Sequence, residues 1–291
     1  MANVYRAMKR AQQEQGLGGE PMAAPAAIEM SGPDDAVPVA METAEPSARP
    51  VPLPVLGAPV NPNGHRLLAE GHFPMLAAHH DKGGTIAEQF RHTRTSLLSQ
   101  YPDQRFVLMV TSADAGEGKT VSTGNMGIVL AERQDRTTLI MDCDLRRATL
   151  TALYRSKPVL GVTDMLRGKA TLSQCLQRTV YPNLFMVSAG TGERGEIAEL
   201  LAQPELETII EQVRSQFDHV LIDAPPVNSV ADAGILGHAV GEALMVIRMN
   251  RTNRESVERA VRLLKAANVK IAGMVLTHQK YFVPNYIYKY S

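Results

Sequence analysis

Apolar runs alternate with segments of helical periodicity from about residue 85 onward. The runs predict β-strands at 106–111, 137–142, 184–188, 219–223, 243–248 and 271–276. The periodic segments predict helices at 85–99, 119–132, about 147–155, 196–215, 229–239 and 253–267. Continuously apolar strands that alternate with helices are typical of a parallel sheet covered on both faces. We therefore expect an α/β fold with a doubly wound, mostly parallel sheet.

The N-terminal quarter of the chain lacks this pattern. A short stretch within residues 1–16 has one apolar side, which predicts a short possible helix. The next segment is rich in proline and alanine, and such a composition buries too little apolar surface to offset the entropy lost on folding. We expect a disordered linker over 17–80, a folded P-loop domain over 83–280 and a tyrosine-rich tail over 281–291.

Composition narrows the range of partners and locations. The formal net charge of +0 gives no general attraction to nucleic acid, so no nucleic-acid partner is predicted. The two cysteines, Cys143 and Cys175, suit a reducing compartment and suggest no disulfide framework. No apolar run reaches the length of a membrane span and no signal peptide is visible, so we expect a cytoplasmic chain that reaches a membrane only through a partner.

A glycine-bearing loop separates the first predicted strand from the helix at 119–132. It is formed by Ala113, Asp114, Ala115, Gly116, Glu117, Gly118, Lys119, Thr120 and Val121. Strand, loop and helix in this order are the context of a phosphate-binding loop, in which backbone N–H groups and the helix N-terminus bind an anion. We expect Lys119 to reach the β- and γ-phosphates of ATP and the Thr120 hydroxyl to bind Mg²⁺. A chance glycine turn before a helix is the alternative.

Three aspartates follow two other predicted strands. Asp142 and Asp144 stand at the end of the strand at 137–142, and Asp223 ends the strand at 219–223. Ligands gather at the carboxyl ends of parallel strands, so these carboxylates should meet Lys119 at one sheet edge. For each aspartate the alternative is a strand-end turn or a helix cap.

Together these motifs resemble the Walker A, Walker A′ and Walker B motifs of the bacterial tyrosine kinases of capsule and exopolysaccharide systems. Two further features match that family. The segment E-Q-F-R-H-T-R fits its oligomerisation helix, with Glu88, Arg91 and Arg94 at the matching positions. The tail fits the tyrosine cluster that these kinases phosphorylate on themselves, with candidate acceptors Tyr281, Tyr286, Tyr288 and Tyr290. The resemblance covers about residues 83 to 291.

The resemblance implies roles for the acidic residues. Asp142 is the candidate acceptor of the phenolic proton, because an unperturbed phenol has a pKa of about 10. Asp144 would assist it or hold Mg²⁺, and Asp223 would position Mg²⁺ through water. Asp142 is also a candidate Mg²⁺ ligand beside Thr120 and Asp223, and sequence alone could exchange these roles. Arg146 could orient the aspartates or contact phosphate, or it could form a surface pair with another side chain or subunit.

The resemblance also implies a function and partners. It predicts an ATP-dependent tyrosine autokinase that phosphorylates its tail in trans within a ring-like homo-oligomer and regulates exopolysaccharide polymerisation or export. The free-standing type of this family works with a membrane adaptor of the polysaccharide co-polymerase type, which would recruit the chain to the inner face of the cell membrane. Thr277 stands where the family usually has an asparagine that can read adenine, which leaves base specificity open.

Two other functions fit parts of the sequence. A switch ATPase of the MinD/ParA type would share the fold, but Asp114 stands where those ATPases carry a signature lysine. An ATP-binding scaffold without turnover would share the loop, but the intact Lys119, Thr120 and aspartates disfavour it.

Overall fold

The computed structural model describes residues 75–156, 160–192 and 195–279. Its strands are β1 Phe106–Ser112, β2 Thr138–Asp142, β3 Leu176–Arg178, β4 Leu184–Val187, β5 His219–Asp223, β6 Glu242–Arg248 and β7 Lys270–Thr277. Its helices are α2 Ala77–His80, α3 Thr85–Leu98, α4 Lys119–Leu130, α5 Thr149–Leu153, α6 Val162–Leu166, α7 Leu172–Cys175, α8 Ile197–Leu201, α9 Glu205–Gln216, α10 Asp232–Val240 and α11 Arg254–Ala266. The predicted N-terminal helix and the tail tyrosines lie outside the described residues.

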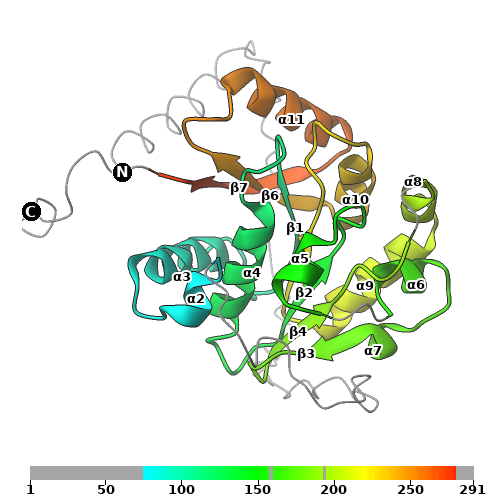
Figure 1. Cartoon of the computed structure of the whole chain (residues 1–291), viewed down its shortest axis with the longest axis horizontal. Coiled ribbons are helices and arrows are strands. Elements are labelled where there is room, and N and C mark those ends of the chain that lie inside the picture. Colours follow the sequence, from blue (N-terminus) through cyan, green and yellow to red (C-terminus); the bar gives the residue numbers. More distant parts are fainter. Residues whose placement is uncertain (1–74, 157–159, 193–194, 280–291) are drawn as a thin grey trace, which may run out of the picture. The chain divides into compact units, whose positions relative to one another are not determined.

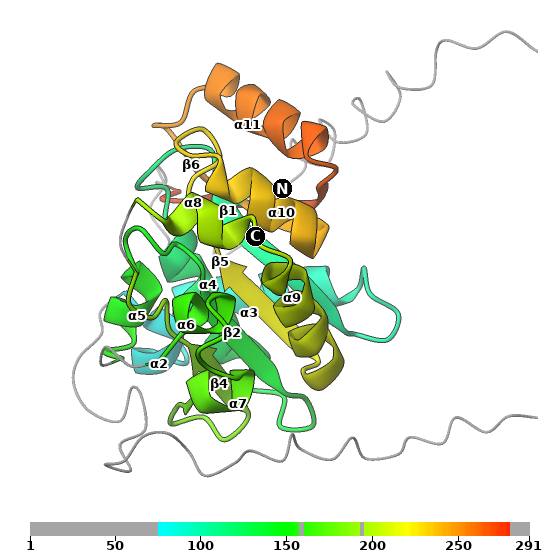
Figure 2. The same ribbon diagram turned by 90° about the vertical axis from the view of Figure 1, so that its right-hand side faces the viewer.

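The strands form one sheet in the order β3-β4-β2-β5-β1-β6-β7 (Figure 1). Every strand pair is parallel except β3–β4. Helices α2 to α5 cover one face of the sheet and α6 to α11 cover the other, with α9, α10 and α11 side by side in Figure 2. The predicted doubly wound, mostly parallel α/β fold is therefore confirmed.

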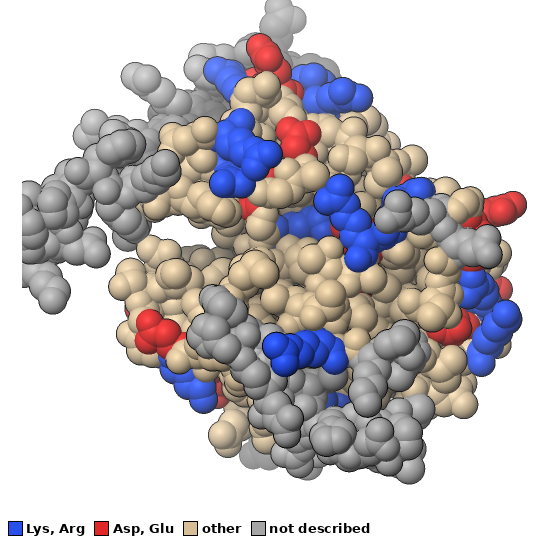
Figure 3. Space-filling model, in the orientation of Figure 1, with Lys and Arg blue, Asp and Glu red and all other residues tan. Residues whose placement is uncertain are grey.

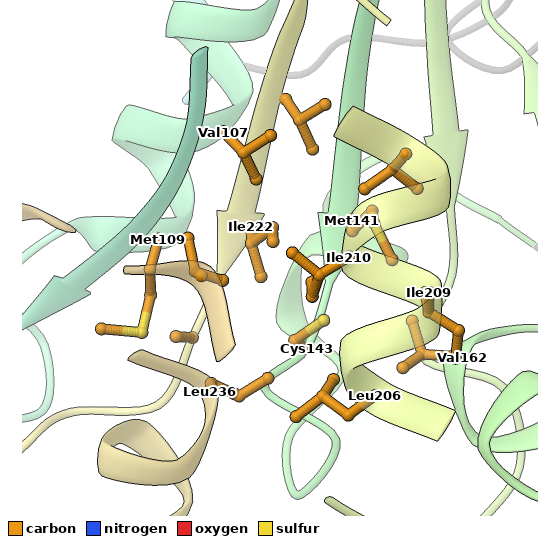
Figure 4. Close-up of a cluster of buried hydrophobic side chains, with 14 of the residues drawn as sticks. Val107, Met109, Met141, Cys143, Val162, Leu206, Ile209, Ile210, Ile222 and Leu236 are labelled. Carbon is orange, nitrogen blue, oxygen red and sulfur yellow. The ribbon is translucent and has the colours of Figure 1, made fainter. Parts of the chain in front are cut away.

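Alternate side chains of the strands feed two separate cores. On β1, Val107 and Met109 pack under α9 and α10, whereas Leu108 and Val110 pack against α4. This period of two follows from the pleat of a strand, and burial on both faces explains why the strands are apolar throughout. Figure 4 shows the first of these cores, which also contains Cys143. Cys143 thus fills space just after the end of β2, and burial raises the pKa of its thiol.

The predicted linker ends earlier than residue 80. Leu76 is fully buried, and α2 packs against α3 and α4. Asn125 of α4 fixes this segment at two points: its amide donates to the Met75 carbonyl (2.8 Å), and its oxygen accepts the Ala78 N–H (2.9 Å). The prediction was wrong for residues 75–80 because a single turn of helix is too short to show a periodic pattern.

Several predicted elements differ in extent. The helix expected at 196–215 is two helices, α8 and α9, which are separated at Pro204 because proline is tolerated at a helix start but not in its interior. The helix expected at 147–155 is the shorter α5, and α10 begins at Asp232 rather than at 229. The short elements α6, α7 and β3 were not predicted. Within the described ranges, no helix combines the length and apolar character that crossing a bilayer requires.

Candidate active site

The loop between β1 and α4 has the backbone of an anion site. Gly116 has φ +81° and Gly118 has φ +97°, values that side chains with a Cβ rarely allow. No acceptor in the described part of the chain takes a hydrogen bond from the N–H groups of residues 115–118. Unpaired N–H groups just before a helix N-terminus are the donors that bind phosphate. The loop therefore fits the phosphate group for which the sequence predicted it.

Contacts from the neighbouring strands fix the shape of this loop. The Arg248 guanidinium at the end of β6 donates to the Gly116 carbonyl (3.3 Å). The Thr277 hydroxyl at the end of β7 donates to the Glu117 carbonyl (2.7 Å). Thr277, the residue that left base specificity open in the sequence, thus has a structural contact to the loop.

Asp114 is held away from the phosphate donors by polar partners. Its carboxylate accepts hydrogen bonds from the hydroxyl of Ser256 on α11 and from the amide of Asn228 (3.3 Å). Its N–H donates to the carboxylate of Glu117 (3.1 Å). The position therefore supplies no positive charge toward a nucleotide.

Lys119, Thr120 and two of the predicted aspartates meet at the carboxyl edge of the sheet. The Lys119 ammonium lies 2.7 Å from Asp144 Oδ2 and 3.5 Å from Asp223 Oδ1. The Thr120 hydroxyl donates to Asp223 Oδ2 (2.7 Å). Asp142 lies beside Asp223 in the register of β2 and β5. The sheet thus brings together the residues that the sequence placed on three strand ends.

Asp142 is fixed by one neighbour. Its Oδ2 accepts the N–H (2.7 Å) and the hydroxyl (2.6 Å) of Thr151 at the start of α5. Burial raises the pKa of Asp142; the hydrogen bonds from Thr151 oppose this rise, and the charge of Asp144 adds to it. Burial also raises the pKa of Asp223, although the charge of Lys119 opposes that rise.

The donor set fits a magnesium ion that is held mainly by a nucleotide. The Oδ1 atoms of Asp142 and Asp223 are buried and accept no hydrogen bond from the residues that the structure describes. The Thr120 hydroxyl lies beside Asp223 and is a further oxygen ligand. In the described ranges no three His, Cys, Asp or Glu side chains form a ready-made metal cage. Mg²⁺ usually keeps several waters and binds one or two protein ligands together with substrate phosphates. Free carboxylate oxygens without a complete protein cage therefore suit this ion.

Arg146 is paired within its own chain. Its guanidinium donates to both carboxylate oxygens of Asp232, at 2.6 and 3.0 Å, at the buried start of α10. The sequence left open whether Arg146 orients the aspartates, contacts phosphate or pairs with another side chain, and the structure contains such a pair.

Beside the pair of Arg146 and Asp232 is a hollow of about 320 Å³. Residues Asp144, Arg146 and Arg147 after β2 line it, together with Pro225, Pro226 and Val230 after β5.

The predicted oligomerisation residues do not join this site. Arg91 binds Glu88 (2.9 Å) and Glu132 (2.8 Å), a residue just beyond the end of α4. Arg94 binds the same Glu132 (2.9 Å) and the Val129 carbonyl (2.5 Å). Both arginines thus tie α3 to α4, while Glu88 stays largely exposed.

Four supporting residues were not predicted: Thr151, Asn228, Asp232 and Ser256. Thr151 binds Asp142, and Asp232 binds Arg146. Asn228 and Ser256 bind Asp114. Only Asp232 had a sequence signal, since an acidic residue in the first turn of a helix suits the helix dipole.

The chain is similar in sequence to known proteins. A family model described as an AAA domain matches residues 106–271. The putative tyrosine-protein kinase CapB of Staphylococcus aureus is 30% identical over 199 residues, which are 68% of this chain and 86% of that protein. The tyrosine-protein kinase ptk of Acinetobacter johnsonii is 31% identical over 204 residues, which are 70% of this chain but 27% of that protein. The chain therefore spans about a quarter of the length of ptk.

Solved structures show the same fold. The kinase domain of the Escherichia coli tyrosine kinase ETK superposes with a TM-score of 0.68 at 26% identity, and the match covers 76% of this chain and 86% of that chain. The septum site-determining protein MinD of Pyrococcus horikoshii, solved with Mg-ADP, superposes with a TM-score of 0.51 at 25% identity, over 59% of this chain and 69% of that one.

Proposed function

Because the chain belongs to the family of bacterial tyrosine-protein kinases, we propose that it uses ATP to phosphorylate its own tyrosines. One observation carries the proposal. Lys119, Thr120 and the strand-end aspartates meet beside a loop whose N–H groups have no acceptor among the described residues. This arrangement supplies the donors and carboxylates that phosphoryl transfer from Mg-ATP requires.

The proposed reaction needs a proton acceptor. The phenolic oxygen forms a bond to the γ-phosphorus, the bond from that phosphorus to the β–γ bridging oxygen breaks, and ADP leaves. The phenolic proton passes to a carboxylate and then to water. Asp142 suits this role because its Oδ1 accepts no hydrogen bond and its pKa is raised toward the neutral range in which a base works best.

The other residues bind and orient the nucleotide. The loop N–H groups and Lys119 would stabilise negative charge on the transferring group. Mg²⁺, when bound, would neutralise phosphate charge, and Thr120 and Asp223 would hold it. The hollow beside Asp144 would admit the acceptor ring, because Pro225, Pro226 and Val230 offer it an apolar wall.

The acceptors in this proposal are the tail tyrosines Tyr281, Tyr286, Tyr288 and Tyr290, modified in trans within a ring-like homo-oligomer. The helix with Glu88, Arg91 and Arg94 would contribute to the interface through its exposed acid. The family resemblance supports this step, together with regulation of exopolysaccharide polymerisation or export. It also supports a membrane adaptor that recruits the chain to the inner face of the cell membrane.

A MinD-like switch ATPase is the second candidate, because its fold is shared. Position 114 disfavours it, since the acid there is bound to Ser256 and directs no cation toward a neighbouring nucleotide.

Mass spectrometry of the full chain after incubation with Mg-ATP tests the proposal. We expect phosphate on tail tyrosines in the natural chain and none in Lys119→Met. A mixture tests transfer in trans: a chain that lacks residues 281–291 should phosphorylate the tail of Lys119→Met. ATP hydrolysis with an unmodified tail, also in the presence of an adaptor's cytoplasmic segment, would contradict the kinase proposal and favour the switch ATPase.

A further inference from the structure

The hollow beside the catalytic carboxylates has an arginine at its edge. Arg147 follows Asp144 by three residues, and its N–H donates to the Asp144 carbonyl (2.9 Å) in the turn after β2. The Arg147 side chain is exposed and lines the same hollow as Asp144. A group that enters the hollow beside Asp144 therefore passes close to this guanidinium.

Arg146 and Arg147 are consecutive in this turn, but among the described residues only the charge of Arg146 is balanced by a nearby carboxylate. Both carboxylate oxygens of the buried Asp232 bind Arg146. In contrast, no carboxylate within residues 75–156, 160–192 and 195–279 lies within ion-pair distance of Arg147. In Figure 3, Lys and Arg side chains gather near the centre of the drawn face, above the place that α5 occupies in the same view in Figure 1. The mouth of the hollow thus offers positive charge to an anion.

The proposed acceptor segment contains no acidic side chain. Residues 281–291 include no Asp or Glu, and Lys289 is their only charged side chain. A phosphate on one tyrosine would add about −1.5 to −2 charges. The first transfer therefore creates the anionic group that an unpaired arginine recognises.

We propose that Arg147 binds a phosphotyrosine two residues from the acceptor, so that the preferred substrate of this site is a tyrosine beside an existing phosphotyrosine. This inference rests on the proposed kinase function and adds a substrate class to it. Arg147 acts here as a specificity-determining residue, because it contacts the neighbouring phosphate rather than the transferring group.

The spacing of the tail tyrosines suits this recognition. Tyr286, Tyr288 and Tyr290 are separated by two residues each. In an extended chain, residues two apart point to the same side and lie roughly 6.6 Å apart. With one of these rings beside Asp144, the phosphate of the next lies on the same side, where Arg147 can donate two parallel hydrogen bonds to it.

The expected consequence is self-reinforcing phosphorylation of the tail. The first transfer is slow, and each phosphate then favours transfer to its neighbour. Tails with a single phosphate should therefore be rarer than they would be if each tyrosine were phosphorylated independently.

Peptide substrates test the inference without interference from the chain's own tail. The enzyme is the full chain in which Tyr281, Tyr286, Tyr288 and Tyr290 are replaced by phenylalanine. Two peptides span residues 285–291, both carry Tyr286→Phe, and Tyr290 is the acceptor in both. One has phosphotyrosine at position 288 and the other has phenylalanine. We expect kcat/KM to be about tenfold higher for the phosphopeptide, the effect of one charge-assisted interaction at a partly exposed site.

Three variants in this background identify the responsible group. Arg147→Gln should abolish the preference, so that the phosphopeptide and the phenylalanine peptide give equal kcat/KM values. Arg147→Lys should keep part of it, because a lysine retains the charge but not the planar pair of donors. Arg262→Gln is the matched control, since Arg262 is an exposed arginine on α11 that lies outside the hollow.

The outcomes separate this inference from the function on which it rests. Equal kcat/KM for both peptides with Arg147 present, or a preference that survives Arg147→Gln, overturns the role of Arg147 and leaves the kinase proposal intact. Failure to phosphorylate either peptide, together with an unmodified tail in the natural chain, overturns both.

Discussion

At the scale of single residues, the chemistry of the site depends on how few hydrogen bonds its buried carboxylates have. Within the described part of the chain, Asp142 accepts two hydrogen bonds, both from Thr151, and its second oxygen accepts none. Burial raises the pKa of Asp142, and the Thr151 hydrogen bonds limit that rise. The ionised form of Asp142, which a base or a magnesium ligand must have, therefore depends on a residue outside the recognised motifs.

This dependence gives a prediction for pH. Thr151→Val removes the hydroxyl donor, so the pKa of Asp142 should rise further and the carboxylate should be neutral over a wider acidic range. The acid limb of the rate of tail phosphorylation should move to higher pH by about one unit, while the rate above that limb changes little. The measurement is the initial rate of phosphotyrosine formation over a series of pH values from about 5 to about 9.

Thr151→Ser is the control, because it keeps the hydroxyl and should keep the natural profile. An acid limb at the same pH in Thr151→Val and the natural chain would show that Asp142 does not limit the rate. The role of base would then pass to Asp144, which also borders the site.

The sequence predicted the residues that bear the chemistry but not the residues that hold them. Lys119, Thr120 and the aspartates belong to motifs whose spacing is fixed by strand, loop and helix. Thr151 and Ser256 are two of many hydroxyl residues, and only the folded backbone brings them to Asp142 and Asp114. No local pattern distinguishes such residues from hydroxyls exposed to solvent.

At the scale of elements, the strands were predictable because burial on both faces makes them apolar throughout. The rule that parallel strands end at one edge predicted that Asp142 and Asp223 would meet. The pairing of β2 with β5, which aligns the two residues, was not predicted from sequence. Elements of one turn or three residues, such as α6, α7 and β3, carry too few residues to show a period. The break between α8 and α9 had a signal in Pro204, since proline removes a donor from a helix interior.

Two glycines of helix α10 allow the effect of side-chain packing to be separated from the effect of helix propensity. A Cβ on Gly237 would lie 2.7 Å from Val269 Cγ2, whereas a Cβ on Gly234 would meet nothing within 4 Å. Gly234→Ala should stabilise the chain by about 0.5–1 kcal/mol through helix propensity. Gly237→Ala should destabilise it by roughly 1–2 kcal/mol, because overpacking against the stiff Val269 exceeds the same gain.

Urea unfolding of the two variants and the natural chain, followed by circular dichroism, measures both effects. Equal stabilisation by the two substitutions would mean that Val269 moves aside freely and that the contact does not constrain α10.

At the scale of the whole molecule, the segment that contains α2 packs on α4, the helix that follows the phosphate-binding loop. The Leu76 side chain packs so closely on α4 that a Cβ on Gly124 would lie 2.8 Å from its Cδ2. Asn125, one residue later, binds both Met75 and Ala78. Since α4 begins at Lys119, the segment that precedes the predicted domain supports the same helix that presents the phosphate-binding residues.

This support should be measurable as stability of the full chain. Leu76→Ala removes a fully buried side chain and leaves a cavity against α4, so the free energy of unfolding should fall by about 2–4 kcal/mol. Met75→Ala is the matched control, because the Met75 side chain is mostly exposed and its contact to Asn125 uses the backbone carbonyl; its effect should stay within about 0.5 kcal/mol. Urea unfolding at equal protein concentration compares the two variants. Similar losses in both would mean that α2 contributes no more than an exposed surface turn, and that the folded unit begins at α3.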